Sequence, residues 1–169
     1  NHRETIFNEE MCGDHVKSLL WAVEKIHAAT QPNRILPEIM DIVFDVFRPE
    51  IAAILALDQR TDTLVPRLVN AGNYDKEIVI SRPIVMQSIQ DAMCLLITHT
   101  EPGQGGEEDI DRWASSVHTA LCAPLLVRAS ALGAIWVEGV RYEECYNEKD
   151  LRLLMAISNH AAPALSKIL

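Results

Sequence analysis

Six histidines and four cysteines are the side chains of this sequence best suited to metal binding or nucleophilic chemistry. No two histidines have the HExxH or H-x3-H spacing that brings two imidazoles to one metal ion. The cysteines form no CxxC pair, so the sequence predicts neither a zinc ribbon nor a redox dithiol. Two of them, Cys94 and Cys122, fall in expected strands, and we interpret these as small buried side chains in a reducing cytosol.

A hydroxyl and a base lie close together where Ser115 and Ser116 precede His118. A serine nucleophile also needs a third group that orients the base, together with an oxyanion hole. The chain has no GxSxG elbow, so we expect these serines to cap a turn.

The preceding stretch, Thr100 to Asp111, is polar and rich in glycine. It lacks both GxxxxGK[ST] and GxGxxG, and its acidic residues Glu107, Glu108, Asp109 and Asp111 would repel a phosphate. It also lacks the D-x-D-x-D-G spacing of a calcium loop. We therefore expect a solvated loop that serves as a lid.

Composition excludes several classes of function. The chain has 169 residues and a formal net charge of −9, which disfavours direct binding to nucleic acid. Its longest apolar run is far shorter than the roughly 20 residues that span a membrane. We expect one cytoplasmic domain that is cut from a longer protein, because the pattern is still helical at Leu169.

The last third of the chain predicts a hairpin followed by a helix. Two apolar runs, Thr119–Val127 and Ala131–Glu138, flank a short polar break. Pro124 indicates an edge position or a bulge, and Gly133 indicates a bulge or a close backbone approach. Asn147 is a suitable N-cap for an amphipathic helix that continues to the C-terminus.

The earlier part of the chain predicts more helices and strands. We expect a helix over Glu9–Ala28, with Val16 and Leu20 on its buried stripe and Trp21 exposed, and a second helix over Arg34–Phe47 that Asn33 caps. The remaining expected elements are strands over 51–57, 64–69, 77–81 and 92–99 and a short helix over 81–90. Strands grouped between helices predict an α+β fold, with an antiparallel sheet and helices on one face.

Four segments in this order resemble the GAF family of small-molecule sensor domains. They are Ala120-Leu121-Cys122-Ala123-Pro124-Leu125, Leu132-Gly133-Ala134-Ile135-Trp136-Val137-Glu138, Tyr146-Asn147-Glu148-Lys149-Asp150-Leu151 and Leu154–Leu165. The resemblance covers roughly residues 17 to 168. It implies a GAF/PAS-like sheet of five or six antiparallel strands, with N- and C-terminal helices on one face and a lidded pocket on the other.

The resemblance also implies where a ligand would bind. Arg82, at the start of the short helix over the pocket, can hold a carboxylate or phosphate, or else pair with a surface acid. Trp113 either lines the pocket or belongs to the core. His99 and His118 end strands of one sheet and can meet at the pocket mouth, or else lie apart on the surface. The candidate ligand contacts are Arg82, His99, Trp113, Ser116 and His118; we predict no catalytic residue and no metal ligand.

Ligand-specific patterns of the family are absent. The N-K-F-D-E signature of cyclic-nucleotide-binding GAF domains cannot be threaded through the chain, and no Cys-His dipeptide of the bilin-binding type occurs. Free methionine sulfoxide reductases use lid cysteines, whereas the expected lid, Thr100–His118, has none. The sequence therefore names no ligand or cofactor.

We expect residues 1–16 to begin a linker helix and residues 17–169 to form a non-enzymatic regulatory GAF domain. It resembles GAF domains that follow forkhead-associated domains, and those of sigma-factor activators, nucleotide cyclases and histidine kinases. The resemblance implies a homodimer through the terminal helices, which would pass a ligand-induced shift to attached effector domains. The alternatives are a ligand-free dimerisation spacer and a thiol reductase on the same scaffold.

Overall fold

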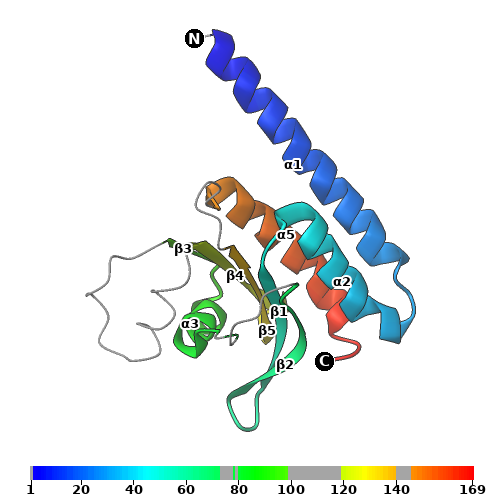
Figure 1. Ribbon diagram of the computed structural model, residues 1–169. Coiled ribbons are helices and arrows are strands. Elements are labelled where there is room, and N and C mark those ends of the chain that lie inside the picture. Colours follow the sequence, from blue (N-terminus) through cyan, green and yellow to red (C-terminus); the bar gives the residue numbers. More distant parts are fainter. Residues whose placement is uncertain (1, 73–77, 79, 99–118, 140–145) are drawn as a thin grey trace, which may run out of the picture.

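The computed structural model describes residues 2–72, 78, 80–98, 119–139 and 146–169, with side chains from residue 15 onward. The helices are α1 (His2–Ala28), α2 (Pro32–Phe47), α3 (Arg82–Asp91) and α5 (Glu148–Leu165), and the strands are β1 (Ile51–Asp58), β2 (Thr63–Asn70), β3 (Leu95–Thr98), β4 (Thr119–Val127) and β5 (Ser130–Gly139). Figure 1 shows a sheet with α2 and α5 on one face and the short helix α3 on the other, and α1 packs against α2 and α5.

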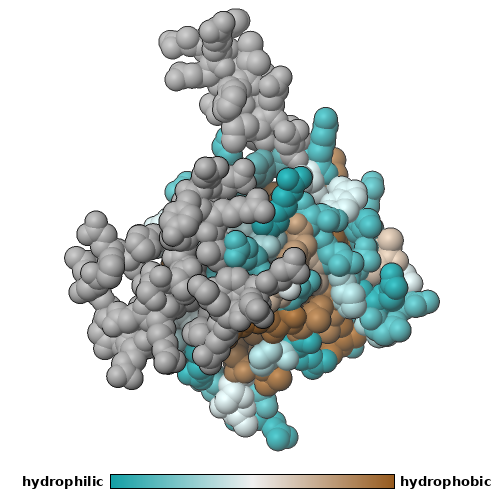
Figure 2. Space-filling view, viewed as in Figure 1, coloured by the Kyte–Doolittle hydropathy of each residue, from teal (hydrophilic) through white to brown (hydrophobic). Residues whose placement is uncertain are grey.

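The sheet has five strands in the order β2-β1-β5-β4-β3, and every pairing is antiparallel. This confirms the expected α+β class. The edge strand β2 carries Pro66, which cannot donate to a further strand, and exposes Val65 and Val69. Figure 2 shows apolar surface over this part of the sheet.

The expected β4–β5 hairpin is confirmed, with a tighter turn than predicted. Only Arg128 and Ala129 lie in the turn, and their φ values of 50° and 64° give the left-handed backbone that suits a two-residue hairpin loop. Gly133 makes the close approach that was expected, since an added Cβ would lie 1.8 Å from the Leu55 carbonyl oxygen of β1. A side chain at this position would therefore push β5 away from β1.

Pro124 lies neither on an edge strand nor at the bulge itself. β4 is flanked by β5 and β3, and the register shift falls between Leu125 and Leu126. Proline is tolerated because β3 pairs only with Thr119 to Cys122, so no β3 residue needs the N–H that Pro124 lacks.

A continuous apolar core lies between the sheet and helices α1, α2 and α5. It includes Ile39 and Ile42 of α2, Leu154 and Ile157 of α5, and inward side chains of β1, β4 and β5. The α2 stripe was predicted from its helical spacing, but its N-cap was not. The cap is Gln31, without a side-chain hydrogen bond, because Pro32 already occupies the first helical position.

The buried stripe of α1 differs from the prediction. Val16 and Leu20 are 52% and 61% exposed, whereas Ala22, which was not expected on the stripe, is buried. Trp21, expected to be exposed, packs partly buried against the core. The buried positions of α1 are therefore offset by about one residue from the predicted ones. The offset is set by how α1 packs against α2 and α5, and helical spacing in the sequence does not contain that information. The N-terminal half of α1 extends beyond the rest of the molecule (Figure 1).

The start of α5 follows the prediction closely. The Asn147 side chain accepts hydrogen bonds from the backbone N–H groups of Lys149 and Asp150, at 2.9 and 3.2 Å. Asp150 returns a bond by accepting from the Asn147 N–H at 3.0 Å, which completes a capping box. This satisfies N–H groups that the first turn of a helix leaves without intrahelical partners.

The third strand is shorter than predicted. The expected strand began at Ala92, but Ala92 ends α3 in a left-handed conformation with φ 51°, and β3 begins at Leu95. Ile80 and Ser81 also lie outside any strand, so the strand expected over 77–81 is wrong at these described positions. Within the described residues, no helix has the length and apolarity of a membrane span.

Candidate functional site

The face of the sheet that carries α3 is where a ligand was expected. Its core is smaller than that of the opposite face, and α3 contributes Val85, Met86 and Ile89 to it. These side chains pack against residues of β1, β4 and β5, among them Cys122 and the fully buried Trp136. A single ten-residue helix thus covers part of this face, whereas α2 and α5 cover the other, with α1 packed against them.

Ser81 and Arg82 stand at the N-terminal end of α3. Ser81 is the N-cap residue and is buried, yet its hydroxyl makes no capping bond and has no hydrogen-bond partner among the described residues. A buried hydroxyl without a partner costs roughly 1–3 kcal/mol, so the site favours an acceptor or donor that would complete it. The partial positive charge of a helix N-terminus suits an anionic group here.

Arg82 is placed at this site, but its guanidinium has another contact. Its Nη2 donates a hydrogen bond of 2.8 Å to the Asp62 carbonyl oxygen in the β1–β2 turn. This bond ties α3 to the hairpin and leaves the remaining guanidinium N–H groups of an exposed side chain for other partners. Contact between Arg82 and a ligand stays a prediction.

Four other predicted contacts, His99, Trp113, Ser116 and His118, lie outside the described residues, as does the expected lid. The proposed meeting of His99 with His118 is therefore untested.

Sequence reasoning missed a buried carboxylate on this face. Glu138 is 2% exposed and lies on β5, two residues after Trp136 and opposite Ile51 of β1. An acidic residue that ends an otherwise apolar strand was the signal available in the sequence. Burying a carboxylate is costly unless it is paired. Glu138 therefore marks a polar position at this end of a face that is otherwise mainly apolar.

The two described cysteines are held as thiols. Burial raises the pKa of Cys94 to about 11. Burial also raises the pKa of Cys122 to about 12, which a Ser88 hydrogen bond opposes and Cys94 reinforces. The thiolate is the reactive form of cysteine, so neither side chain is prepared for nucleophilic chemistry at neutral pH.

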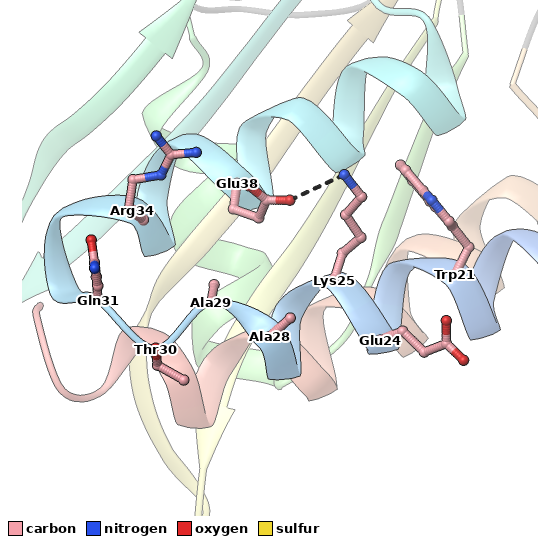
Figure 3. A pocket seen from close by; sticks show the side chains of 9 residues that line it. All are labelled: Trp21, Glu24, Lys25, Ala28, Ala29, Thr30, Gln31, Arg34 and Glu38. Atoms are coloured by element: carbon pink, nitrogen blue, oxygen red, sulfur yellow. Dashed lines mark ion pairs between the residues drawn. The ribbon is translucent and has the colours of Figure 1, made fainter.

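The helical layer has its own clefts. The largest described here, about 640 Å³, lies between α1 and α2 (Figure 3). Lys25 spans it, with its ammonium 3.5 Å from a Glu38 carboxylate oxygen and 5.3 Å from the centre of the Trp21 ring. The ion pair joins α1 to α2, whereas the contact of Lys25 with Trp21 lies within α1, so Lys25 and Glu38 already have internal partners.

A second groove lies between α1 and α5 and is mainly apolar. Leu19, Leu153 and Ala156 line it together with the exposed Val16. At its rim, His15 Nε2 lies 3.6 Å from an Asp150 carboxylate oxygen, which links the two helices.

Comparison with known proteins identifies the scaffold. A family model described as "GAF domain" matches residues 31–167. Among solved structures, the GAF domain of an Acinetobacter phosphoenolpyruvate-protein phosphotransferase is similar at 14% identity and a TM-score of 0.67, over 90% of this chain and 92% of that one. The GAF domain of a two-component sensor histidine kinase from Bacillus halodurans is similar at 14% identity and a TM-score of 0.63, over 83% and 97%.

A third similar structure is an enzyme. It is the free methionine-R-sulfoxide reductase of Neisseria meningitidis, in complex with its substrate, at 12% identity and a TM-score of 0.68, over 90% and 88%. At these identities the structures show a shared fold only. Among curated proteins, none matches the chain. The family model spans most of the sequence and agrees with the observed topology, and the chain therefore belongs to the GAF domain family.

Proposed function

We propose that this domain is a non-enzymatic sensor of a cytoplasmic signalling protein that binds a small anionic molecule on the α3 face. The observation that carries the proposal is the buried Ser81 hydroxyl, which has no partner among the described residues and stands beside Arg82 at a helix N-terminus. A phosphate or carboxylate would accept from this hydroxyl and from the guanidinium. Similar structures from a sensor histidine kinase and a chemotaxis protein support a sensor role.

A sensor of this kind needs an output, and α1 with α5 supplies the natural route. Val16 and Leu20 on α1 and Met155 on α5 are exposed apolar residues. We infer that these helices pack against a second copy and lead to effector domains. Ligand binding would then shift the arrangement of the helices by its differential affinity for two states. Sedimentation that finds only monomer at high protein concentration would contradict the dimer.

The ligand-free spacer is the second candidate function. The exposed apolar residues of α1 and α5 favour it equally, because it needs dimerisation and no ligand. The reductase candidate is weaker, since the thiol groups of Cys94 and Cys122 stay protonated near neutral pH.

Thermal-shift screening against a library of small phosphates and carboxylates separates the sensor from the spacer. We expect at least one compound to raise the melting temperature of the wild type, with the shift reduced in both Arg82→Gln and Ser81→Ala. Arg60→Gln is the matched control, because it removes an exposed arginine from the neighbouring β1–β2 turn. The absence of any stabilising compound would favour the spacer, and equal shifts in all variants would contradict a ligand site at Ser81 and Arg82.

A further inference from the structure

Two histidines from opposite ends of the chain meet where α1 ends. The ring centroids of His27 on α1 and His160 on α5 lie 6.0 Å apart, with the ring planes inclined by 67°. Both side chains are exposed, and both line a cleft of about 380 Å³ formed by α1, α2 and α5. The rings meet edge to face and are not stacked.

This spacing suits one metal ion held between two imidazoles. A transition-metal ion such as Zn²⁺ lies about 2.1 Å from each nitrogen ligand. Adding the distance from each ligand nitrogen to the centre of its ring places the centroids of two histidines on one ion roughly 5–6.5 Å apart. The observed 6.0 Å falls in this range, and only side-chain rotation is needed to aim one nitrogen of each ring at a common point.

We propose that His27 and His160 bind one divalent transition-metal ion of the class that prefers imidazole, with water in the remaining positions. Neutral imidazole is a good ligand for Zn²⁺, Cu²⁺ and Ni²⁺ and a poor one for Mg²⁺ or Ca²⁺. No third His, Cys, Asp or Glu side chain joins a metal-sized group among the described residues, so the site is open and water completes it.

Of the charges near His27 and His160, one favours a bound cation and one opposes it. His27 lies in the last turn of α1, where free carbonyl groups give a partial negative charge that favours a cation. Lys167, beyond the end of α5, lines the same cleft, and its ammonium opposes a cation. A site with this balance would bind the ion reversibly.

The site goes beyond the proposed anion sensor, because it lies on the opposite face of the sheet from α3. An ion held there would tie the last turn of α1 to α5. The site would therefore couple metal availability to the pair of helices that forms the expected output.

Titration calorimetry with ZnCl2 on the tag-free 169-residue protein tests the proposal. We expect one Zn²⁺ per chain, and at least tenfold weaker binding in both His27→Ala and His160→Ala. Lys167→Gln should bind several-fold more tightly, because a repelling charge is gone. His15→Ala is the matched control, since it removes another α1 histidine that faces α5, and it should bind like the wild type.

Three outcomes would overturn the proposal: no binding by the wild type, equal binding by the His27 and His160 variants, or loss of binding in His15→Ala. Melting curves without metal establish that the variants are folded. Electron paramagnetic resonance of bound Cu²⁺ adds a readout on the wild type itself. Two coordinated imidazole nitrogens are expected there, and a spectrum with one or none would contradict the site.

Discussion

The two faces of the sheet are built from the same strands but bury different chemistry. The face under α1, α2 and α5 holds a large, almost wholly apolar core, in which side chains such as Leu154 and Ile157 are fully buried. The face under α3 has a smaller apolar cluster, and beside it lie the buried polar residues Ser81 and Glu138. Ser158 of α5 is a buried polar residue of the first face, and its hydroxyl also has no partner among the described residues. Our proposal places recognition on the α3 face, which has the smaller apolar cluster.

Truncation of one core residue on each face gives the largest expected effect. Leu154→Ala should lower the free energy of unfolding by about 4 kcal/mol, and Ile89→Ala on α3 by about 2 kcal/mol, since the smaller cluster can relax around the cavity. Urea denaturation measures both. Met93→Ala, at an exposed position just after α3, serves as the control and should change stability by less than about 0.5 kcal/mol. If Ile89→Ala lowered the free energy of unfolding as much as Leu154→Ala does, the expected difference between the two faces would be contradicted.

Alkaline pH should lower the free energy of unfolding through the Cys122 thiol, which is buried on the α3 face. Cys122 keeps its proton to a pKa of about 12 in the folded protein but loses it near 9.0 when unfolded. Above pH 9 the unfolded state binds fewer protons, so stability falls as pH rises, by up to about 1.4 kcal/mol per pH unit from this group.

Urea unfolding of the wild type and Cys122→Ala at pH 7 to 10.5 measures this contribution. The difference between the two proteins isolates the thiol from tyrosines and lysines that also titrate. A difference that stays constant with pH would show that Cys122 is not held as a thiol by burial.

The two helix N-caps provide the smallest and most local test. Asn147→Ala should cost about 1 kcal/mol, because it removes both capping bonds at the start of α5. Ser81→Ala should leave stability unchanged or raise it, because it removes a buried hydroxyl that has no capping bond and no partner among the described residues. Thermal unfolding of the two variants compares them directly. Equal losses would mean that the Ser81 hydroxyl contributes to stability and is not reserved for a ligand.

The elements that sequence reasoning located well are those with local causes. The β4–β5 hairpin follows from two apolar runs around a short break, and the α5 cap follows from Asn147 and Asp150. The close approach at Gly133 was also anticipated, because a glycine inside an apolar strand needs a reason.

The features that sequence reasoning missed depend on contacts between distant segments. The exposure of Leu20 and the burial of Trp21 depend on how α1 docks against α2 and α5. The contact of Arg82 with Asp62 depends on where α3 crosses the β1–β2 hairpin. His27 and His160 are neighbours only because the two terminal helices lie side by side, so neither residue stood out in the sequence.

The length of α1 gives small changes near its C-terminal end a large reach. Its 27 residues form a rod about 40 Å long, and its N-terminal half extends beyond the domain (Figure 1). A tilt of about 5° around the last turn, where His27 lies, would displace the far end by about 3.5 Å. A small change in the angle between α1 and α5 is therefore a shift of several ångströms at the N-terminal end of α1.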